Sequence, residues 1–460
     1  YEINGGDQDD ELLGSSANDT LAGGAGNDTF NVDDGIDTVT DLSGSDVLVI
    51  SEGATARATV SADFTATDAT ANNNGTATLT VVNDADVNLA LATVGTATED
   101  GYMVDASGNT AASILVGSAA NDTITGGLAN DSITGGPGAD SLTGGDGDDV
   151  FTFTENVQLR GDTVNGGGDI DTIEFTTAID TLSGSGDQGD NFHADFEHVT
   201  NVERIALFGS SHVNLGDVLK TAGVATILTG DGTTTLRYDS DALGTITVDA
   251  AAMVDDATLL LTQFGGDDTA QAYAVTNVKG DVDASGMQRA VAVLTAAGSG
   301  FDVSLTGGAG ADTLGGGEGN DTITGGAGAD VINGNGGANV VTDAGQGEDV
   351  INHTVANSTV EIAVTGTDLV KLDADQTGAI ANSDAGINTS VSASLSAAAV
   401  TLNGNTGDDT LTGGAGNDTI TGGAGADTLT GGTGNDTFVY QEGVAVGAVA
   451  TAAQVATANG

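Results

Sequence analysis

Nine residues recur along this chain in the order Gly-Gly-x-Gly-x-Asp-x-apolar-x. Residues 413–421 read Gly-Gly-Ala-Gly-Asn-Asp-Thr-Ile-Thr, and 422–430 and 431–439 repeat the pattern in frame. Glycine tolerates positive φ and lets a backbone carbonyl approach a ligand without an intervening Cβ. The three residues that end each unit predict a very short strand whose middle side chain, such as Ile420, faces inward. The pattern therefore predicts a solenoid with two nonapeptides per coil and coils stacked at about 4.8 Å.

Each unit also places one carboxylate at the end of its glycine-rich turn. Calcium takes about six to eight oxygen ligands, and such a turn supplies both carbonyl and carboxylate oxygens. We expect calcium ions between stacked loops, shared by Asp side chains of neighbouring coils, so that folding depends on metal binding. The predicted carboxylate ligands are Asp10, Asp19, Asp28, Asp37, Asp122, Asp131, Asp140, Asp149, Asp162, Asp171, Asp312, Asp321, Asp330, Asp349, Asp409, Asp418, Asp427 and Asp436. The predicted carbonyl ligands are Gly24, Gly26, Gly136, Gly138, Gly145, Gly147, Gly308, Gly310, Gly317, Gly319, Gly326, Gly328, Gly414, Gly416, Gly423, Gly425, Gly432 and Gly434.

The repeats alternate with β-rich segments. Four repeat clusters are predicted at 1–50, 117–174, 307–352 and 404–440, separated by Ala/Thr/Val-rich segments at 51–116, 175–306 and 353–403 and followed by a low-complexity tail at 441–460. The third cluster loses its carboxylate at Asn339. We expect an all-β, elongated chain in which parallel β-roll clusters alternate with segments that are either β-solenoid or β-sandwich.

Short strands in the longest intervening segment are predicted at 225–228, 233–238, 245–248 and 258–262. Their spacing fits a solenoid and a sandwich equally well. In addition, Val282-Asp283-Ala284-Ser285-Gly286 echoes residues 104–108, and each phrase precedes a repeat cluster by a similar distance. This echo indicates a duplicated module at the entrance to a cluster.

The amino-acid composition argues against several kinds of protein. The net charge is −59, from 67 acidic and 8 basic residues, so a phosphate backbone is not an expected partner. No apolar run is long enough for a transmembrane helix, and we expect no membrane insertion. The chain has no cysteine and no tryptophan, which excludes disulfides and disfavours one large globular core.

The sequence carries no recognisable catalytic motif. His193 and His198 are five residues apart, whereas a zinc-protease helix needs four, and no Gly-x-Ser-x-Gly nucleophile elbow occurs. Paired acids such as Asp148-Asp149 are common, but with few basic residues and no Trp a polysaccharide groove is hard to build. We therefore expect no enzyme within this chain.

The nonapeptide resembles the calcium-binding repeat of RTX-type exported proteins. The phrase Asn201-Val202-Glu203-Arg204-Ile205, the two Val-Asp-Ala-Ser-Gly phrases and the Thr/Ala-rich strands are similar to those of calcium-dependent surface-layer proteins of Gram-negative bacteria. That resemblance implies type I secretion, an extracellular location at the bacterial cell surface, and self-assembly into a lattice or filament stabilised by calcium. It also implies a cell-envelope polysaccharide as a partner, through a region outside this chain. The alternatives are a calcium-rigidified segment of a large RTX adhesin and the calcium-binding tail of an RTX hydrolase or toxin.

Overall fold

The computed structural model contains almost only short β-strands. It describes residues 1–95, 101–154, 156–178, 196, 198–207, 211–215, 224, 226–229, 234–238, 246–250, 258–263, 273–276, 278, 281–287, 292–296, 302–335, 338–342, 350–353, 359–364, 369–372, 377–382, 390–393, 399–404 and 408–439. Within these residues the one helix is α1 (Asn156–Gly161). The chain divides into an N-terminal unit (1–208 and 216–226) and a C-terminal unit (209–215 and 227–460).

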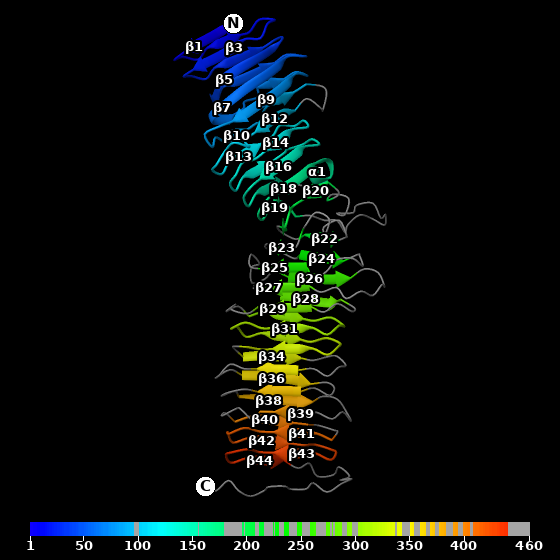
Figure 1. Cartoon of the computed structure of the whole chain (residues 1–460). Coiled ribbons are helices and arrows are strands. Elements are labelled where there is room, and N and C mark those ends of the chain that lie inside the picture. Colours follow the sequence, from blue (N-terminus) through cyan, green and yellow to red (C-terminus); the bar gives the residue numbers. More distant parts are fainter. Residues whose placement is uncertain are drawn as a thin grey trace. The chain divides into compact units, whose positions relative to one another are not determined.

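The first wall of the N-terminal unit is a parallel ladder of strands that lie far apart in sequence (Figure 1). Its strands are β1 (Glu2–Gly6), β3 (Thr20–Gly24), β5 (Ile36–Gly44), β7 (Thr55–Thr65), β9 (Thr76–Val81), β12 (Tyr102–Asp105), β14 (Thr123–Thr125), β16 (Ser141–Gly145), β18 (Thr163–Gly167) and β20 (Val199–Thr200), paired in this order. Within uninterrupted nonapeptide runs, partners are 18 residues apart, as in the pair Ile124 and Leu142, whereas the insertion that contains α1 widens the spacing to 22 between Leu142 and Val164. The 18-residue offset is two nonapeptides, as the pattern predicts.

Two further ladders close the coils of this unit. The second wall contains β2 (Glu11–Leu13), β4 (Thr29–Val32), β6 (Val47–Ile50), β8 (Ala71–Asn72) and β11 (Thr93–Val94). The third wall starts at the C-terminal end of β7 and continues through β10 (Val87–Asn88), β13 (Ile114–Val116), β15 (Ser132–Thr134), β17 (Val150–Phe153), β19 (Thr172–Phe175) and β21 (Arg204–Leu207).

Residues 55–95 form three-sided coils, because there all three walls are present at once. Phe64 at the end of β7 pairs with Val87, while Ala71 of β8 pairs with Thr93 of the second wall. The second wall ends at β11, and in the following coils the third wall forms the side opposite the first wall. The two-sided roll of cluster 1 thus passes through three-sided coils into the two-sided roll of cluster 2.

The C-terminal unit is built from two parallel ladders. One contains β22 (His212–Leu215), β24 (Thr234–Tyr238), β26 (Thr258–Gln263), β28 (Asp281–Gly286), β30 (Ser304–Thr306), β32 (Thr322–Thr324), β34 (Ala338–Thr342), β36 (Thr359–Val364), β38 (Thr377–Asn382), β40 (Thr401–Asn403), β42 (Thr419–Thr421) and β44 (Thr437–Val439). The other contains β25 (Ile246–Asp249), β27 (Tyr273–Thr276), β29 (Ala292–Thr295), β31 (Thr313–Gly315), β33 (Val331–Asn333), β35 (Val350–His353), β37 (Leu369–Leu372), β39 (Ser390–Ser392), β41 (Thr410–Thr412) and β43 (Thr428–Thr430).

The parallel pairing decides between solenoid and sandwich in the intervening segments. The four strands expected between 225 and 262 correspond to β23 (Thr226–Thr229), β24, β25 and β26. Sandwich sheets are typically antiparallel, whereas β24 pairs with β26, and β25 with β27, in parallel. The same holds for β36 with β38. The expected all-β fold with parallel β-rolls is confirmed, and in the described residues these segments are solenoidal.

The core is a thin column of inward side chains. Ile124, Ile133, Leu142 and Phe151 are each at most 1% exposed, and one such residue recurs per nonapeptide. The flanking Thr residues face outward, as expected from the alternation of a strand. No helix in the described part of the chain is long and apolar enough to cross a membrane.

Candidate metal centres

Each nonapeptide loop connects one wall of a coil to the next. We number its residues 1 to 6, so that loop 135–140 has Gly135 at position 1 and Asp140 at position 6. Most position-6 carboxylates are almost fully buried although they lie in turns, whereas Asp10, Asp427 and Asp436 are partly exposed. The carboxylates whose side chains are at most 3% exposed are Asp19, Asp28, Asp37, Asp122, Asp131, Asp140, Asp149, Asp162, Asp171, Asp312, Asp321, Asp330, Asp409 and Asp418.

One oxygen of each carboxylate links two coils. Oδ1 of Asp140 accepts the N–H of Asp122 at 2.8 Å, and Oδ1 of Asp149 accepts the N–H of Asp131 at 2.7 Å. In each pair the acceptor lies 18 residues after the donor. The same bond recurs at Asp28, Asp37, Asp330, Asp427 and Asp436. The structure therefore stacks the predicted carboxylates in rows along the edges of the roll.

The second oxygen, Oδ2, is buried without a hydrogen-bond donor in Asp37, Asp140, Asp149, Asp162 and Asp171. A buried charged oxygen without a partner costs free energy that a cation would offset. Burial raises the pKa of Asp140, Asp149 and Asp162 to about 7 and that of Asp171 to about 6, and for Asp140 the neighbouring Asp162 carboxylate contributes a smaller part of the rise in pKa.

The position-1 glycine leaves room only for this carboxylate. A Cβ on Gly135 would collide with Oδ2 of Asp140. A Cβ on Gly144 would collide with Oδ2 of Asp149 and with the carbonyl oxygen of Gly166 in the next coil. Carboxylate and carbonyl oxygens from two coils thus meet beside one glycine, and an oxygen-only cradle of this kind fits calcium.

The predicted carbonyl ligands lie at positions 2 and 4. Some position-2 carbonyls also accept a hydrogen bond from the coil above: Gly308 from the N–H of Ala327 at 2.8 Å, and Gly414 from that of Thr433 at 2.9 Å. A carbonyl oxygen has a second lone pair, so this bond leaves it able to bind a cation. Which of these oxygens bind metal stays a prediction. Asp349 lies outside the described residues.

Sequence reasoning missed two carboxylates in the same rows. Oδ1 of Asp46 accepts the N–H of Asp28 at 2.8 Å, and Oε2 of Glu203 accepts the N–H of Asp171 at 2.9 Å. Asp46 follows a degenerate turn, and Glu203 follows Asp171 by 32 residues. The signal available for Asp46 was the run Gly44-Ser45-Asp46 before apolar Val47 and Leu48.

A second row was also missed, at position 5. There Asn or Asp accepts an N–H from the following coil: Asn121 from Ala139 at 2.8 Å, and Asn130 from Asp148 at 3.0 Å. The frequent Asn at position 5 was the visible signal. The position-5 side chain thus accepts an N–H from the following coil, and the position-6 carboxylate accepts one from the preceding coil. Each loop is therefore hydrogen-bonded to the coils on both sides of it.

Where the carboxylate is lost, an amide replaces it. Asn339 accepts the N–H of Asp321 at 2.8 Å through Oδ1, and its Nδ2 donates to the carbonyl of Gly334 at 2.8 Å. An Asn at position 6 therefore keeps the link between coils and provides its own donor for the position-1 carbonyl.

Side chains alone do not make a conventional metal cluster. Within the described residues no group of three His, Cys, Asp or Glu side chains is placed to hold an ion. Each coil contributes one position-6 carboxylate per edge, so a cation there needs further oxygen ligands, which the backbone carbonyls of the loops can supply. His193 lies outside the described residues.

Comparison with known families agrees with this geometry. A family profile described as RTX calcium-binding nonapeptide repeat (4 copies) matches residues 4–49, 107–142, 116–151, 295–323, 306–341, 315–351 and 403–438. No curated protein matches the chain. The matched segments contain the stacked loops described above, and the nonapeptide prediction is confirmed. The chain therefore carries RTX calcium-binding nonapeptide repeats, folded as parallel β-rolls.

Proposed function

We propose that this chain is a secreted, calcium-dependent structural protein that assembles with copies of itself into a layer or filament at a bacterial cell surface. The observation that carries the proposal is the set of buried carboxylates whose Oδ2 has no donor. They make the roll incomplete without cations, and a net charge of −59 opposes compaction further. Such a chain folds best where calcium is abundant, which is outside the cell.

The surface of the roll supports assembly. Outward residues of the strands are small and regular, as in Thr410 and Thr412 of β41, which pair with Thr428 and Thr430 of β43. Stacked strands of this kind present flat faces suited to side-by-side contacts.

Further carboxylates remain exposed at the loop edges, among them Asp34, Asp146 and Asp169. Calcium held between such groups on neighbouring copies would link them without any additional domain. The function we favour is therefore structural, with the same ion serving folding inside the roll and contacts outside it.

Electron microscopy of the purified chain in millimolar calcium, repeated after chelation with circular dichroism alongside, tests this proposal. We expect ordered sheets or filaments that disappear with the chelator. Calcium-induced β-structure in particles that stay monomeric would contradict self-assembly and favour the adhesin segment or the tail of an enzyme.

A variant separates folding from assembly. Replacing Asp34, Asp146 and Asp169 with Asn removes exposed charge and leaves the buried carboxylates intact. We expect the calcium-induced circular dichroism to persist while the assemblies are lost. Assemblies that form as in the wild type would exclude these carboxylates as contact sites.

A further inference from the structure

The loops that match the nonapeptide occur in two conformations. In one, which we call closed, the N–H of position 2 donates to Oδ2 of the loop's own Asp. The distance is 2.6 Å from Ser118 to Asp122 and 2.8 Å from Gly414 to Asp418. The closed loops are 14–19, 117–122, 126–131, 307–312, 316–321 and 413–418.

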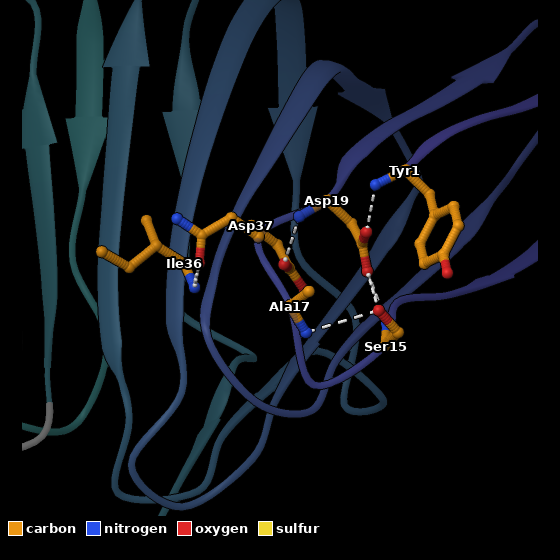
Figure 2. A network of polar contacts seen from close by, with 7 residues as sticks. Tyr1, Ser15, Ala17, Asp19, Ile36 and Asp37 are labelled. Carbon is orange, nitrogen blue, oxygen red and sulfur yellow. Dashed lines mark hydrogen bonds and ion pairs between the residues drawn. The ribbon is translucent and has the colours of Figure 1, made fainter.

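Loop 14–19 shows the closed state in detail. Both the N–H and the hydroxyl of Ser15 donate to Oδ2 of Asp19, at 2.6 and 2.9 Å, while Oδ1 of Asp37 reaches the N–H of Asp19 from the next coil (Figure 2). Asp122 is bound in the same way by Ser118. The carboxylate is satisfied by the protein alone.

In the other conformation, which we call open, position 2 is a glycine with positive φ. Gly136 has φ of 104° and Gly145 of 123°, and their loops leave Oδ2 of Asp140 and Asp149 without a donor. The open loops with such a glycine include 23–28, 135–140, 144–149, 166–171, 325–330, 422–427 and 431–436.

The open and closed loops differ in the residues of the preceding coil on which they stack. A Cβ on Gly136 would collide with the carbonyl oxygen of Ser118, and one on Gly145 with that of Gly127, so each open loop rests on another nonapeptide loop. In the closed loops, by contrast, Oδ1 of Asp122, Asp131, Asp321 and Asp418 accepts an N–H from Tyr102, Ser113, Val303 and Val400 of the preceding coil, and none of these donors is the position-6 residue of a nonapeptide loop.

Under two closed loops lies the turn of a Val-Asp-Ala-Ser-Gly phrase. A Cβ on Gly127 would come within 2.8 Å of the carbonyl oxygen of Asn109, and one on Gly308 within 2.7 Å of that of Met287. Both turns are closed by the same bond, from Asn109 to Ala106 at 2.8 Å and from Met287 to Ala284 at 2.9 Å. The duplicated phrase is therefore the base of one edge of each of these two nonapeptide runs.

The N-terminal unit also encodes the closed state in its sequence. Position 4 is Ala17, Ala120 or Ala129 in its closed loops, whereas in open loops Gly138 and Gly147 hold this position with φ of 154° and 111°, and Asp169, a residue type that tolerates positive φ better than Ala, holds it with φ of 69°. A residue with a Cβ rarely adopts such a φ. These loops cannot easily convert to the open form.

We propose that the closed loops are calcium-independent end caps, and that a run starts to bind calcium through its position-6 carboxylates only at the open loop stacked on them. The proposal rests on the calcium dependence proposed above. Each run would thus begin on a coil that folds without metal and offers its carbonyls to the first ion.

Calcium stoichiometry of the full chain tests this assignment. The variant Asp140→Asn with Asp149→Asn should bind about one ion fewer per substituted loop. It should still fold, because Asn339 already shows that an amide fits position 6. Asp122→Asn with Asp131→Asn should bind as many ions as the wild type, with lower thermal stability because an acceptor is lost.

A second variant leaves every carboxylate in place. Gly136→Ser with Gly138→Ala gives loop 135–140 the position-2 and position-4 residues of closed loop 117–122. Because a Cβ at either position meets a carbonyl oxygen of the coil beneath, the loop must leave the open form and should lose about one ion. Ser118→Ala, at position 2 of the closed loop, is the control and should lose none. Equal losses in the two Asp→Asn variants would overturn the end-cap assignment alone. A wild-type chain that takes up no calcium would overturn the proposed function and the assignment together.

Discussion

The three-sided coils of residues 55–95 and the nonapeptide coils of cluster 2 share the same first wall, yet their interiors differ. The three-sided coils bury several apolar side chains each, among them Ala56, Val60 and Phe64 along β7. A nonapeptide coil buries one per nine residues and adds two acidic loops. Partner spacing differs too: Ala58 pairs with Leu79, whereas Ile124 pairs 18 residues on with Leu142.

This difference shows how two kinds of coil can share one ladder of strands and yet be stabilised in different ways. Where the chain uses more residues per coil, it can close a third side and fill it with apolar groups, and burial supplies the stability. Where the coil is shortened to two nonapeptides, the interior is too thin, and the loop carboxylates need cations. The comparison predicts separable responses to calcium.

Chelation should have the largest effect. After addition of EGTA, amides of 135–153 should exchange at least about tenfold faster with deuterium, while amides of 55–94 keep most of their protection. Hydrogen exchange read by mass spectrometry measures both regions in one sample. Equal loss of protection in the two regions would show that the three-sided coils depend on calcium as well.

Core truncations should sharpen the contrast. Phe64→Ala should lower the free energy of unfolding by about 3–5 kcal/mol with or without calcium, because it opens a cavity in the apolar core. Leu142→Ala, behind the open loop 135–140, should cost about 2–5 kcal/mol in calcium only, since the open coils of cluster 2 are already unfolded in chelator at neutral pH. Denaturant unfolding with and without EGTA measures both. The comparison would fail if Leu142→Ala had the same effect in both buffers.

The pH response should run in opposite directions with and without calcium. The pKa values of Asp140, Asp149 and Asp162 are raised from 3.8 to about 7. A raised pKa means that the folded state binds protons more tightly than the unfolded state, so this stability is present in acid and lost as the pH rises through about 7. In EGTA, where the open coils of cluster 2 are unfolded at neutral pH, their stability should therefore be highest in acid and fall between about pH 4 and pH 7.

With calcium bound, protons compete for the same oxygens, and acid should instead release the ions. Thermal melts at matched pH, with EGTA or with calcium, measure the two trends. A cluster 2 whose stability in EGTA increases with pH would contradict the burial of these carboxylates.

The hydrogen bonds of the position-5 side chains should contribute least to the free energy of unfolding. Asn130→Ala removes the acceptor for the N–H of Asp148 and should cost about 0.5–1.5 kcal/mol. Leu128→Ala, in the same loop with its side chain 54% exposed, is the matched control. Denaturant unfolding in calcium distinguishes them. Equal costs would mean that the position-5 row adds nothing beyond loop composition.

Much of the roll follows from local pattern. The 18-residue register, the inward Ile420 and the carboxylate rows at Asp140 and Asp149 could all be predicted, because every nonapeptide repeats the same short-range rules of glycine turns and alternating strands. The position of Glu203 could not, since 32 residues separate it from Asp171 and no repeat fixes that length.

The sequence by itself determined the repeat, its strands and the rows of carboxylates that are placed to bind a cation. Only the tertiary structure decided that residues 55–95 form a three-sided coil, and that identical-looking loops divide into closed and open forms. Loop 307–312 has glycine at positions 2 and 4 like an open loop, yet it is closed because Met287, and not another nonapeptide, lies beneath it. The physical reason is that a loop's state depends on the carbonyl it rests on, and that carbonyl belongs to a coil distant in sequence.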